Sequence, residues 1–148
     1  MSTTHEIDFD FDVLPLVEHC TPTINSEDDC GVDLRCRNAV QVPPLSFVSI
    51  PLGIKAAFPP EWQAVLFDRS GISKRNGLFR AGGVIEGVYR GEWEVIIHNP
   101  TRSSVSFNAG DRVCQVLFFK KPRKQLNIVS SLTETERGEN GFGSSGVE

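Results

Sequence analysis

Residues 47–67, FVSIPLGIKAAFPPEWQAVLF, decide the fold class of this chain. Three short apolar or alternating segments, 47–52, 54–58 and 62–67, follow one another here with glycine and proline between them. A period of two is typical of a strand that buries one face, and closely spaced strands with turn residues between them are typical of sandwiches and barrels. The stretch therefore predicts an all-β domain.

The same signals continue on both sides of this stretch. Upstream, the apolar residues of segment 7–13 alternate with aspartates, as in a strand with one face in water. One short helix is expected, with the Ser70 hydroxyl capping its first amides and Gly77 ending it. The expected fold is thus all-β, a distorted jelly roll or β-barrel of short strands with one short helix. Its other strands are expected at 31–34, 40–42, 93–98, 103–107 and 112–119.

The character of the chain changes after Phe119. The basic run Lys120 to Lys124 is interpreted as a solvated strand end. The last segment, 137–146, has a single large apolar residue, Phe142, among glycines, and it cannot build a core. We therefore expect a β-barrel domain at 1–129 and a flexible C-terminal arm at 130–148 that becomes ordered on a ligand.

Composition limits the partners and the compartment. A net charge of −4 over 148 residues argues against binding nucleic acid by bulk charge. No apolar run approaches the roughly 20 residues that span a bilayer, so no membrane partner is expected. The four cysteines lack metal-binding spacing and are expected to be reduced. The expected location is the cytoplasm, or the host-cell cytoplasm if the source is viral, with a nuclear location left open.

The unusual chemistry lies in residues 69–94, RSGISKRNGLFRAGGVIEGVYRGEWE. Its glycines allow backbone amides to approach a ligand closely. A carboxylate, Glu86, precedes an aromatic residue, Tyr89, by three positions. The stretch is therefore a candidate site for an anion and a ring.

Five segments together resemble, in order, the motifs of the homotrimeric dUTP pyrophosphatases (dUTPases). The sequence departs from the family pattern at two positions, with Glu86 where an aspartate is usual and Asp68 where a proline is usual. The matching segments are 30–34, 68–72, 83–91, 110–115 and 137–146.

The resemblance implies hydrolysis of dUTP to dUMP and pyrophosphate. Glu86 would be the catalytic base that activates the water attacking the α-phosphate, and Asp33 would hold Mg²⁺ through its water shell. Tyr89 would pack on the deoxyribose, and Phe142 of the arm would stack on uracil. The implied assembly is a homotrimer with shared active sites. The implied substrate-binding residues are Arg69, Ser70, Gly71, Gly83, Val84, Ile85, Tyr89, Gln115, Arg137, Gly141, Phe142, Gly143 and Ser144.

Two rival functions remain open at this point. One is a dCTP deaminase, an enzyme that resembles this family in fold and also uses a glutamate after a similar hairpin. The other is a non-catalytic module that would use the fold to bind a partner protein. Individual residues also have structural alternatives. Tyr89 would then pack in the core, Asp33 would cap a turn, and Arg69 and Arg137 would be surface charges. For His98 a core or interface role is favoured over catalysis, and for Arg112 a structural role is expected.

Overall fold

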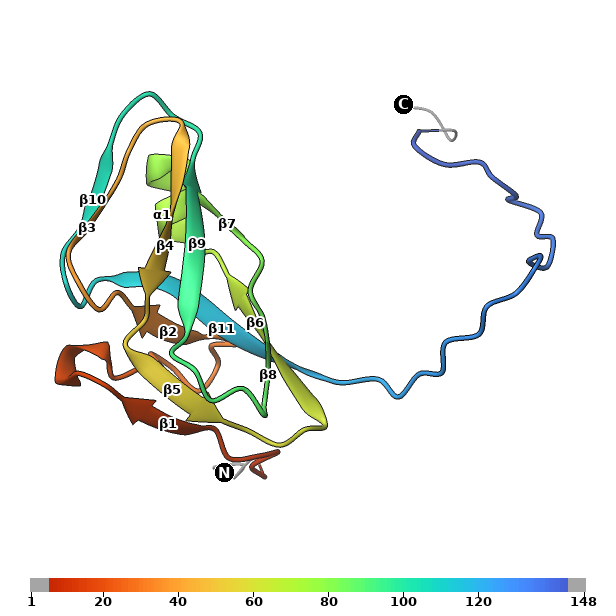
Figure 1. Ribbon diagram of the computed structural model, residues 1–148, viewed down its shortest axis with the longest axis horizontal. Helices are drawn as coiled ribbons and strands as arrows, with labels where there is room; N and C mark the ends of the chain where they lie inside the picture. The colour runs from red at the N-terminus through yellow and green to blue at the C-terminus, as the bar shows by residue number, and fades with distance from the viewer. Residues whose placement is uncertain (1–5, 144–148) are drawn as a thin grey trace.

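Short antiparallel strands build the folded part of the computed structural model, which describes residues 6–143 (Figure 1). One α-helix and one 3₁₀ helix interrupt them. The all-β prediction is confirmed. In chain order the elements are β1 (Asp12–Pro15), η1 (Glu18–Cys20), β2 (Val32–Arg35), β3 (Val40–Val42), β4 (Ser46–Pro51), β5 (Ile54–Ala57), β6 (Trp62–Phe67), α1 (Ser70–Asn76), β7 (Phe79–Ala81), β8 (Val84–Glu86), β9 (Glu94–Asn99), β10 (Val105–Phe107) and β11 (Arg112–Lys120).

Two sheets organise the molecule. The larger has the order β2-β11-β6-β8, and the smaller has the order β4-β9-β7. Two further pairs, β1 with β5 and β3 with β10, lie beside them. Every pairing is antiparallel. The sheets are open, so the jelly-roll alternative describes the architecture better than a closed barrel.

The first strand is shorter than the alternation at 7–13 predicts. Only Asp12–Pro15 pairs, because β5 offers partners to these four residues alone. The side-chain pattern nevertheless holds, since Phe9 packs on Trp62 with ring centroids 4.7 Å apart and Phe11 packs on Phe118 at 4.8 Å. Packing of the apolar face thus continues beyond the hydrogen-bonded strand.

The core lies between the inner faces of the sheets. Leu34, Leu66 and Trp93 are almost fully buried within it. Three of the four cysteines, Cys20, Cys36 and Cys114, are buried as well, which confirms that they act as small apolar residues. Burial raises the pKa of each of these three thiols.

Helix α1 starts without the predicted cap. Arg69 occupies the N-cap position with extended backbone, and no side chain caps the helix, so the prediction that Ser70 does so is wrong. The end of the helix is as predicted. Gly77 adopts φ +68°, and its N–H donates to the Ser73 carbonyl oxygen at 3.0 Å.

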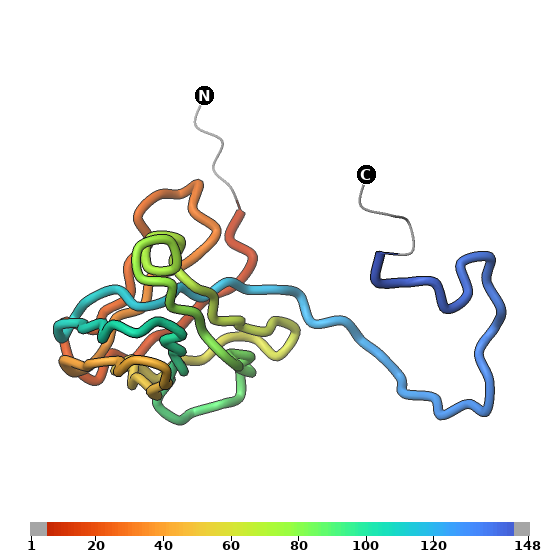
Figure 2. Tube along the Cα trace, turned by 90° about the horizontal axis from the view of Figure 1, so that it is seen from above, coloured from red at the N-terminus to blue at the C-terminus, as the bar shows by residue number. Residues whose placement is uncertain are grey.

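Beyond β11 the chain leaves the folded body. Figure 2 shows the tail running outward and then turning. The apolar Leu126 and Ile128 are 84% and 88% exposed, so they find no core in this chain. The boundary at residue 129 stays a prediction, because the last strand already ends at Lys120. In the described part of the chain, no helix is long and apolar enough to cross a membrane.

Candidate active site

The first, second and fourth motif segments meet in one polar pocket of about 220 Å³. Strand register explains the meeting, because Gln115 on β11 lies opposite Asp33 on β2 and opposite Phe67 on β6. The chain then leaves β6 and enters α1 beside them. We call this pocket the phosphate half-site. It is lined by Asn25, Asp29, Cys30, Gly31, Asp33, Arg69, Ser70, Gly71 and Gln115.

Asp33 is the charged centre of the phosphate half-site. Its side chain is only 8% exposed. Arg69 Nε donates to Oδ1 at 3.0 Å, and Arg112 Nη1 donates to Oδ2 at 3.2 Å. Asn25 Nδ2 also donates to Oδ2, at 2.9 Å. A buried carboxylate needs such partners, so the turn-cap alternative for Asp33 is wrong, and Arg69 is more than a surface charge.

Arg69 and Ser70 are held at the edge of the pocket by their neighbours. The ion pair with Asp33 fixes the Arg69 guanidinium, while Ser70 is exposed as the first residue of α1. Gln115 Nε2 donates to the Asp68 carbonyl oxygen at 2.9 Å. The pocket thus presents a cation, a hydroxyl and an amide to a bound anion, which are the groups that bind phosphate oxygens.

Magnesium fits this pocket as an ion that arrives with a substrate. Within residues 6–143, no three His, Cys, Asp or Glu side chains could together hold a metal. Both Asp33 oxygens already accept hydrogen bonds, so direct ligation would compete with Arg69 and Arg112. Mg²⁺ commonly keeps several waters and rides on substrate phosphates beside one or two carboxylates. The donor set at Asp33 is compatible with that kind of binding.

The third motif forms a separate hairpin wall. Glu86 ends β8 with an exposed side chain, and Tyr89 follows in the turn at 49% exposure. Tyr89 Oη donates to the Glu92 carbonyl oxygen at 3.3 Å. Because Tyr89 is half exposed, the core-packing alternative is wrong. We call this wall the hairpin half-site. It lines a pocket of about 420 Å³ with Val84, Ile85, Glu86, Val88 and Tyr89.

Glycine is required in this hairpin for two different reasons. Gly83 has φ +100°, a conformation that other residues rarely adopt, and a Cβ there would also press on Leu66. Gly87 is constrained by space instead, since its Cβ would overlap the carbonyl oxygen of Phe58. The hairpin therefore packs directly on the backbone of its neighbours, which fixes where Glu86 emerges.

The two half-sites are too far apart within one chain to act on one phosphate. Both lie on the same face of the larger sheet, because Gln115 pairs with Phe67 and Glu86 pairs with Gln63. Four residues along β6 and two strand spacings separate Gln115 from Glu86, about 16 Å between Cα atoms. A catalytic base must come within about 3 Å of the proton that it removes.

The arm residues do not join either half-site in this chain. Arg137 lies on the exposed tail, where its Nε donates to the Asn140 carbonyl oxygen at 2.9 Å. Phe142 is fully exposed, and Gly141 and Gly143 have open space around them. Ser144 lies outside the described residues.

Several residues in or beside the phosphate half-site make contacts that the sequence does not predict. Arg112, expected only to be structural, shares Asp33 with Arg69. Asn25 lies in a polar loop outside the five motif segments, and Cys30 begins the first segment but has no predicted role there. Asp68, the departure from the usual proline, accepts a hydrogen bond from the Arg80 N–H at 2.8 Å. It therefore ties the end of β6 to β7.

His98 lies on the outer face of the smaller sheet. It stacks between Phe47, at 5.2 Å, and Phe79, at 5.0 Å, measured between ring centroids. Phe47 and Phe79 are 63% and 46% exposed. The three rings form an exposed aromatic row, which agrees with an interface role and places His98 outside both half-sites.

Comparison with known proteins agrees with the motif pattern. The dUTPase family model matches residues 18–146. The deoxyuridine 5'-triphosphate nucleotidohydrolase of Legionella pneumophila (strain Paris) is 34% identical over 140 residues, covering 91% of this chain and 89% of that protein. The enzyme of the same name from Actinobacillus pleuropneumoniae serotype 5b is 35% identical over 132 residues, covering 86% of this chain and 87% of that protein.

Solved structures show the same fold. The dUTPase of Staphylococcus bacteriophage 80alpha with dUpNHpp superposes with a TM-score of 0.84 at 24% identity, covering 93% of this chain and 99% of that one. A point mutant of the dUTPase from S. aureus phage phi11, described with a structural Mg(II) ion, gives a TM-score of 0.76 at 20% identity, covering 84% and 99%. With the five motifs in order and a family match over most of its length, the chain belongs to the dUTPase family.

Proposed function

We propose that this protein is a dUTP diphosphatase that cleaves dUTP to dUMP and pyrophosphate. The observation that carries the proposal is the phosphate half-site, where Arg69, Ser70 and Gln115 surround one polar pocket. The curated relatives named as deoxyuridine 5'-triphosphate nucleotidohydrolases support the choice of substrate.

Glu86 is the proposed base. Its carboxylate takes a proton from the water that attacks the α-phosphorus, and the bond from that phosphorus to the bridging oxygen breaks. Arg69 and the Ser70 hydroxyl stabilise the charge that develops on the phosphate oxygens, where positioning and electrostatics do most of the work. Gln115 orients the triphosphate from the other wall of the pocket. Mg²⁺, when bound, neutralises phosphate charge, and Asp33 would hold it through water.

Specificity is assigned to the hairpin half-site and the arm. The Tyr89 ring excludes a 2′-hydroxyl by packing against the deoxyribose. Backbone groups of Gly83, Val84 and Ile85 recognise uracil by hydrogen bonds to the edge of the base. Phe142 stacks on the base when the arm closes, while Arg137 and the arm glycines close on the phosphates. Closure of this kind removes water from the reacting groups.

The proposed assembly is a homotrimer in which each active site combines segments of different chains. Support comes from the separation of about 16 Å between Gln115 and Glu86, because neither half-site is complete alone. The exposed arm offers a third contribution. The cytoplasmic location expected from the sequence stays a prediction.

The decisive test separates the two enzyme classes and the binding module. Incubation with dUTP and Mg²⁺ is expected to release pyrophosphate and dUMP, whereas dCTP and UTP stay intact. Ammonia released from dCTP without pyrophosphate would establish the deaminase instead. A protein that turns over none of these nucleotides would leave the binding module as the better interpretation.

A further inference from the structure

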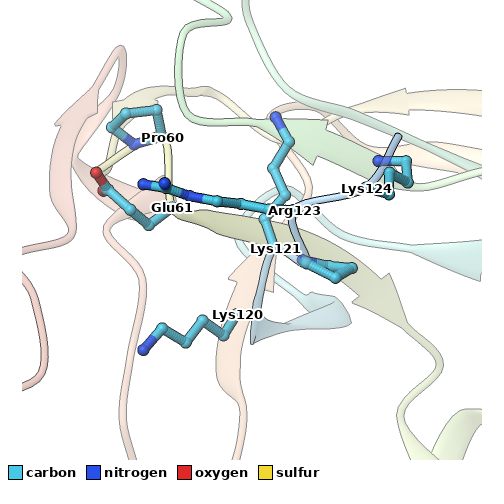
Figure 3. Close-up of a pocket in the computed structure, with 7 residues that line it drawn as sticks. Pro60, Glu61, Lys120, Lys121, Arg123 and Lys124 are labelled. Atoms are coloured by element: carbon cyan, nitrogen blue, oxygen red, sulfur yellow. The ribbon is translucent and has the colours of Figure 1, made fainter. Parts of the chain in front are cut away.

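The strongest concentration of positive charge outside the half-sites lies at the root of the C-terminal tail. All four of its cationic side chains are exposed, and within residues 6–143 none of them forms an ion pair. Together they border an open hollow of about 1070 Å³ beside Pro60 and Glu61 (Figure 3). We call these four residues the basic cluster: Lys120, Lys121, Arg123 and Lys124.

The root of the basic cluster is held in place. Lys120 is the last residue of β11, and the Lys121 N–H donates to the Glu61 carbonyl oxygen at 2.6 Å. Pro122 follows with its restricted backbone. Figure 3 shows the Lys120 and Arg123 side chains spreading apart, with Arg123 directed toward Glu61. The charges therefore start from a fixed point on the sheet.

Strand register places this fixed point near the proposed base. Lys120 pairs with Trp62 on β6, and the neighbouring residue Gln63 pairs with Glu86 on β8. Two strand spacings and one residue step put the Lys120 and Glu86 Cα atoms about 10 Å apart. Because Trp62 and Gln63 are consecutive on β6, the two side chains leave opposite faces of the sheet, so the cluster can act on this site only through its long-range field. The distance between the Cα atoms exceeds the Debye length of about 8 Å at physiological ionic strength, so the interaction is weakened by screening there. At about 0.01 M salt, where the Debye length is about 30 Å, the field of the basic cluster reaches the hairpin half-site.

The basic cluster differs in charge from the rest of the molecule. The whole chain carries −4 and the basic cluster contributes +4, so the other residues together carry −8. An acidic surface repels a polyanion, and a local basic patch then gives the approach a direction. The Glu86 carboxylate is itself negative and repels the triphosphate, so nearby positive charge would offset this repulsion at the hairpin.

We propose that the basic cluster steers the negatively charged substrate toward the shared active site, of which the hairpin half-site is one wall. This inference rests on the proposed function, because it takes dUTP as the ligand. The cluster acts at long range and makes no contact in the reacting complex. Its role is therefore in the association rate, and the chemical step proceeds without it.

The test compares two matched double variants of the full chain. Lys121→Gln with Arg123→Gln removes two cations of the basic cluster, while Lys55→Gln with Arg102→Gln removes two exposed cations elsewhere. Association of dUpNHpp is followed by stopped flow at low and high salt. At about 0.01 M salt we expect the first variant to associate about threefold more slowly than wild type, and at about 1 M salt equally fast. The second variant and all kcat values for dUTP should match wild type.

Three results would overturn the inference. An equal slowing at both salt concentrations would show direct contact, and an equal slowing in the control variant would show only bulk charge. The first variant could also associate with dUpNHpp as fast as wild type while losing the binding that wild type shows to a labelled single-stranded DNA oligomer. That result would make the basic cluster a nucleic-acid site. Wild-type turnover of dUTP is measured first, since its absence would instead defeat the proposed function.

Discussion

At the scale of single residues, Glu86 tests the chemistry most directly. Within residues 6–143 its carboxylate has no ion pair, so its replacement disturbs no structural contact of that kind. We expect Glu86→Gln to lower kcat for dUTP about 10²- to 10⁴-fold, the usual contribution of a general base. Binding of dUpNHpp should persist. The exposed Glu94 serves as control, because Glu94→Gln should leave kcat unchanged. Near wild-type turnover by Glu86→Gln would refute the assignment.

Cys30 gives a second test at this scale. It is the exposed thiol and lines the phosphate half-site, whereas the other three are buried with raised pKa values. A disulfide reagent should therefore modify one thiol in the native protein at neutral pH and four after unfolding. Modification should block dUTP turnover, and dUpNHpp should protect against it. The Cys30→Ser variant should resist the reagent, and inactivation of that variant would contradict the prediction.

The motif segments could be found in the sequence, but the contacts between their residues could not. Arg69 and Asp33 stand in recognisable segments. Arg112 and Asn25 complete the network only because β2 and β11 pair in one particular register and the preceding loop folds back. Such contacts join positions 79 and 8 residues from Asp33. Local sequence patterns do not encode that register.

At the scale of elements, the hairpin half-site depends on its glycines. Gly82 has φ +67° with open space around it, so Gly82→Ala adds backbone strain alone, about 1 kcal/mol. Gly87→Ala places its Cβ against a backbone carbonyl oxygen that cannot rotate away, at about 3 kcal/mol. Urea denaturation should rank the two variants in that order. The reverse order would mean that the hairpin relaxes around Gly87.

Loss of the arm, unlike the glycine substitutions, is expected to leave the stability of the fold unchanged. Residues 130–140 are all exposed, so they contribute little to folding. Truncation after Val129 should leave the thermal unfolding midpoint unchanged within about 2 °C, since ΔΔG is close to zero. Turnover of dUTP should fall strongly, because closure over the substrate is lost. Full turnover by the truncated protein would remove the arm from the mechanism.

Strands were predictable because alternation and turn residues are local signals. The first and last residues of the elements were harder to predict. The pattern at 7–13 continues past the four residues that find a partner in β5. The start of α1 is misleading for a similar reason, since a serine at the start of a helix is typical of a cap, whereas here Arg69 holds the N-cap position with extended backbone.

At the scale of the whole molecule, shared sites predict complementation. Glu86→Gln chains keep an intact phosphate half-site, and Ser70→Ala chains keep an intact hairpin half-site. Each variant alone should be nearly inactive. After equal mixing, unfolding and refolding together, about a quarter of the sites would combine two intact halves by random assembly. Turnover near a quarter of wild type is therefore expected. Separately refolded samples, mixed afterwards, are the control, and equal inactivity in both would contradict shared sites.

The aromatic row of Phe47, His98 and Phe79 has a consequence for the newly made chain. Together with Ile96, 37% exposed, it gives the smaller sheet an outward apolar face. Exposed apolar patches promote aggregation when they are not covered. An isolated chain, in which this face is uncovered, should therefore be prone to aggregate until a partner covers the aromatic row.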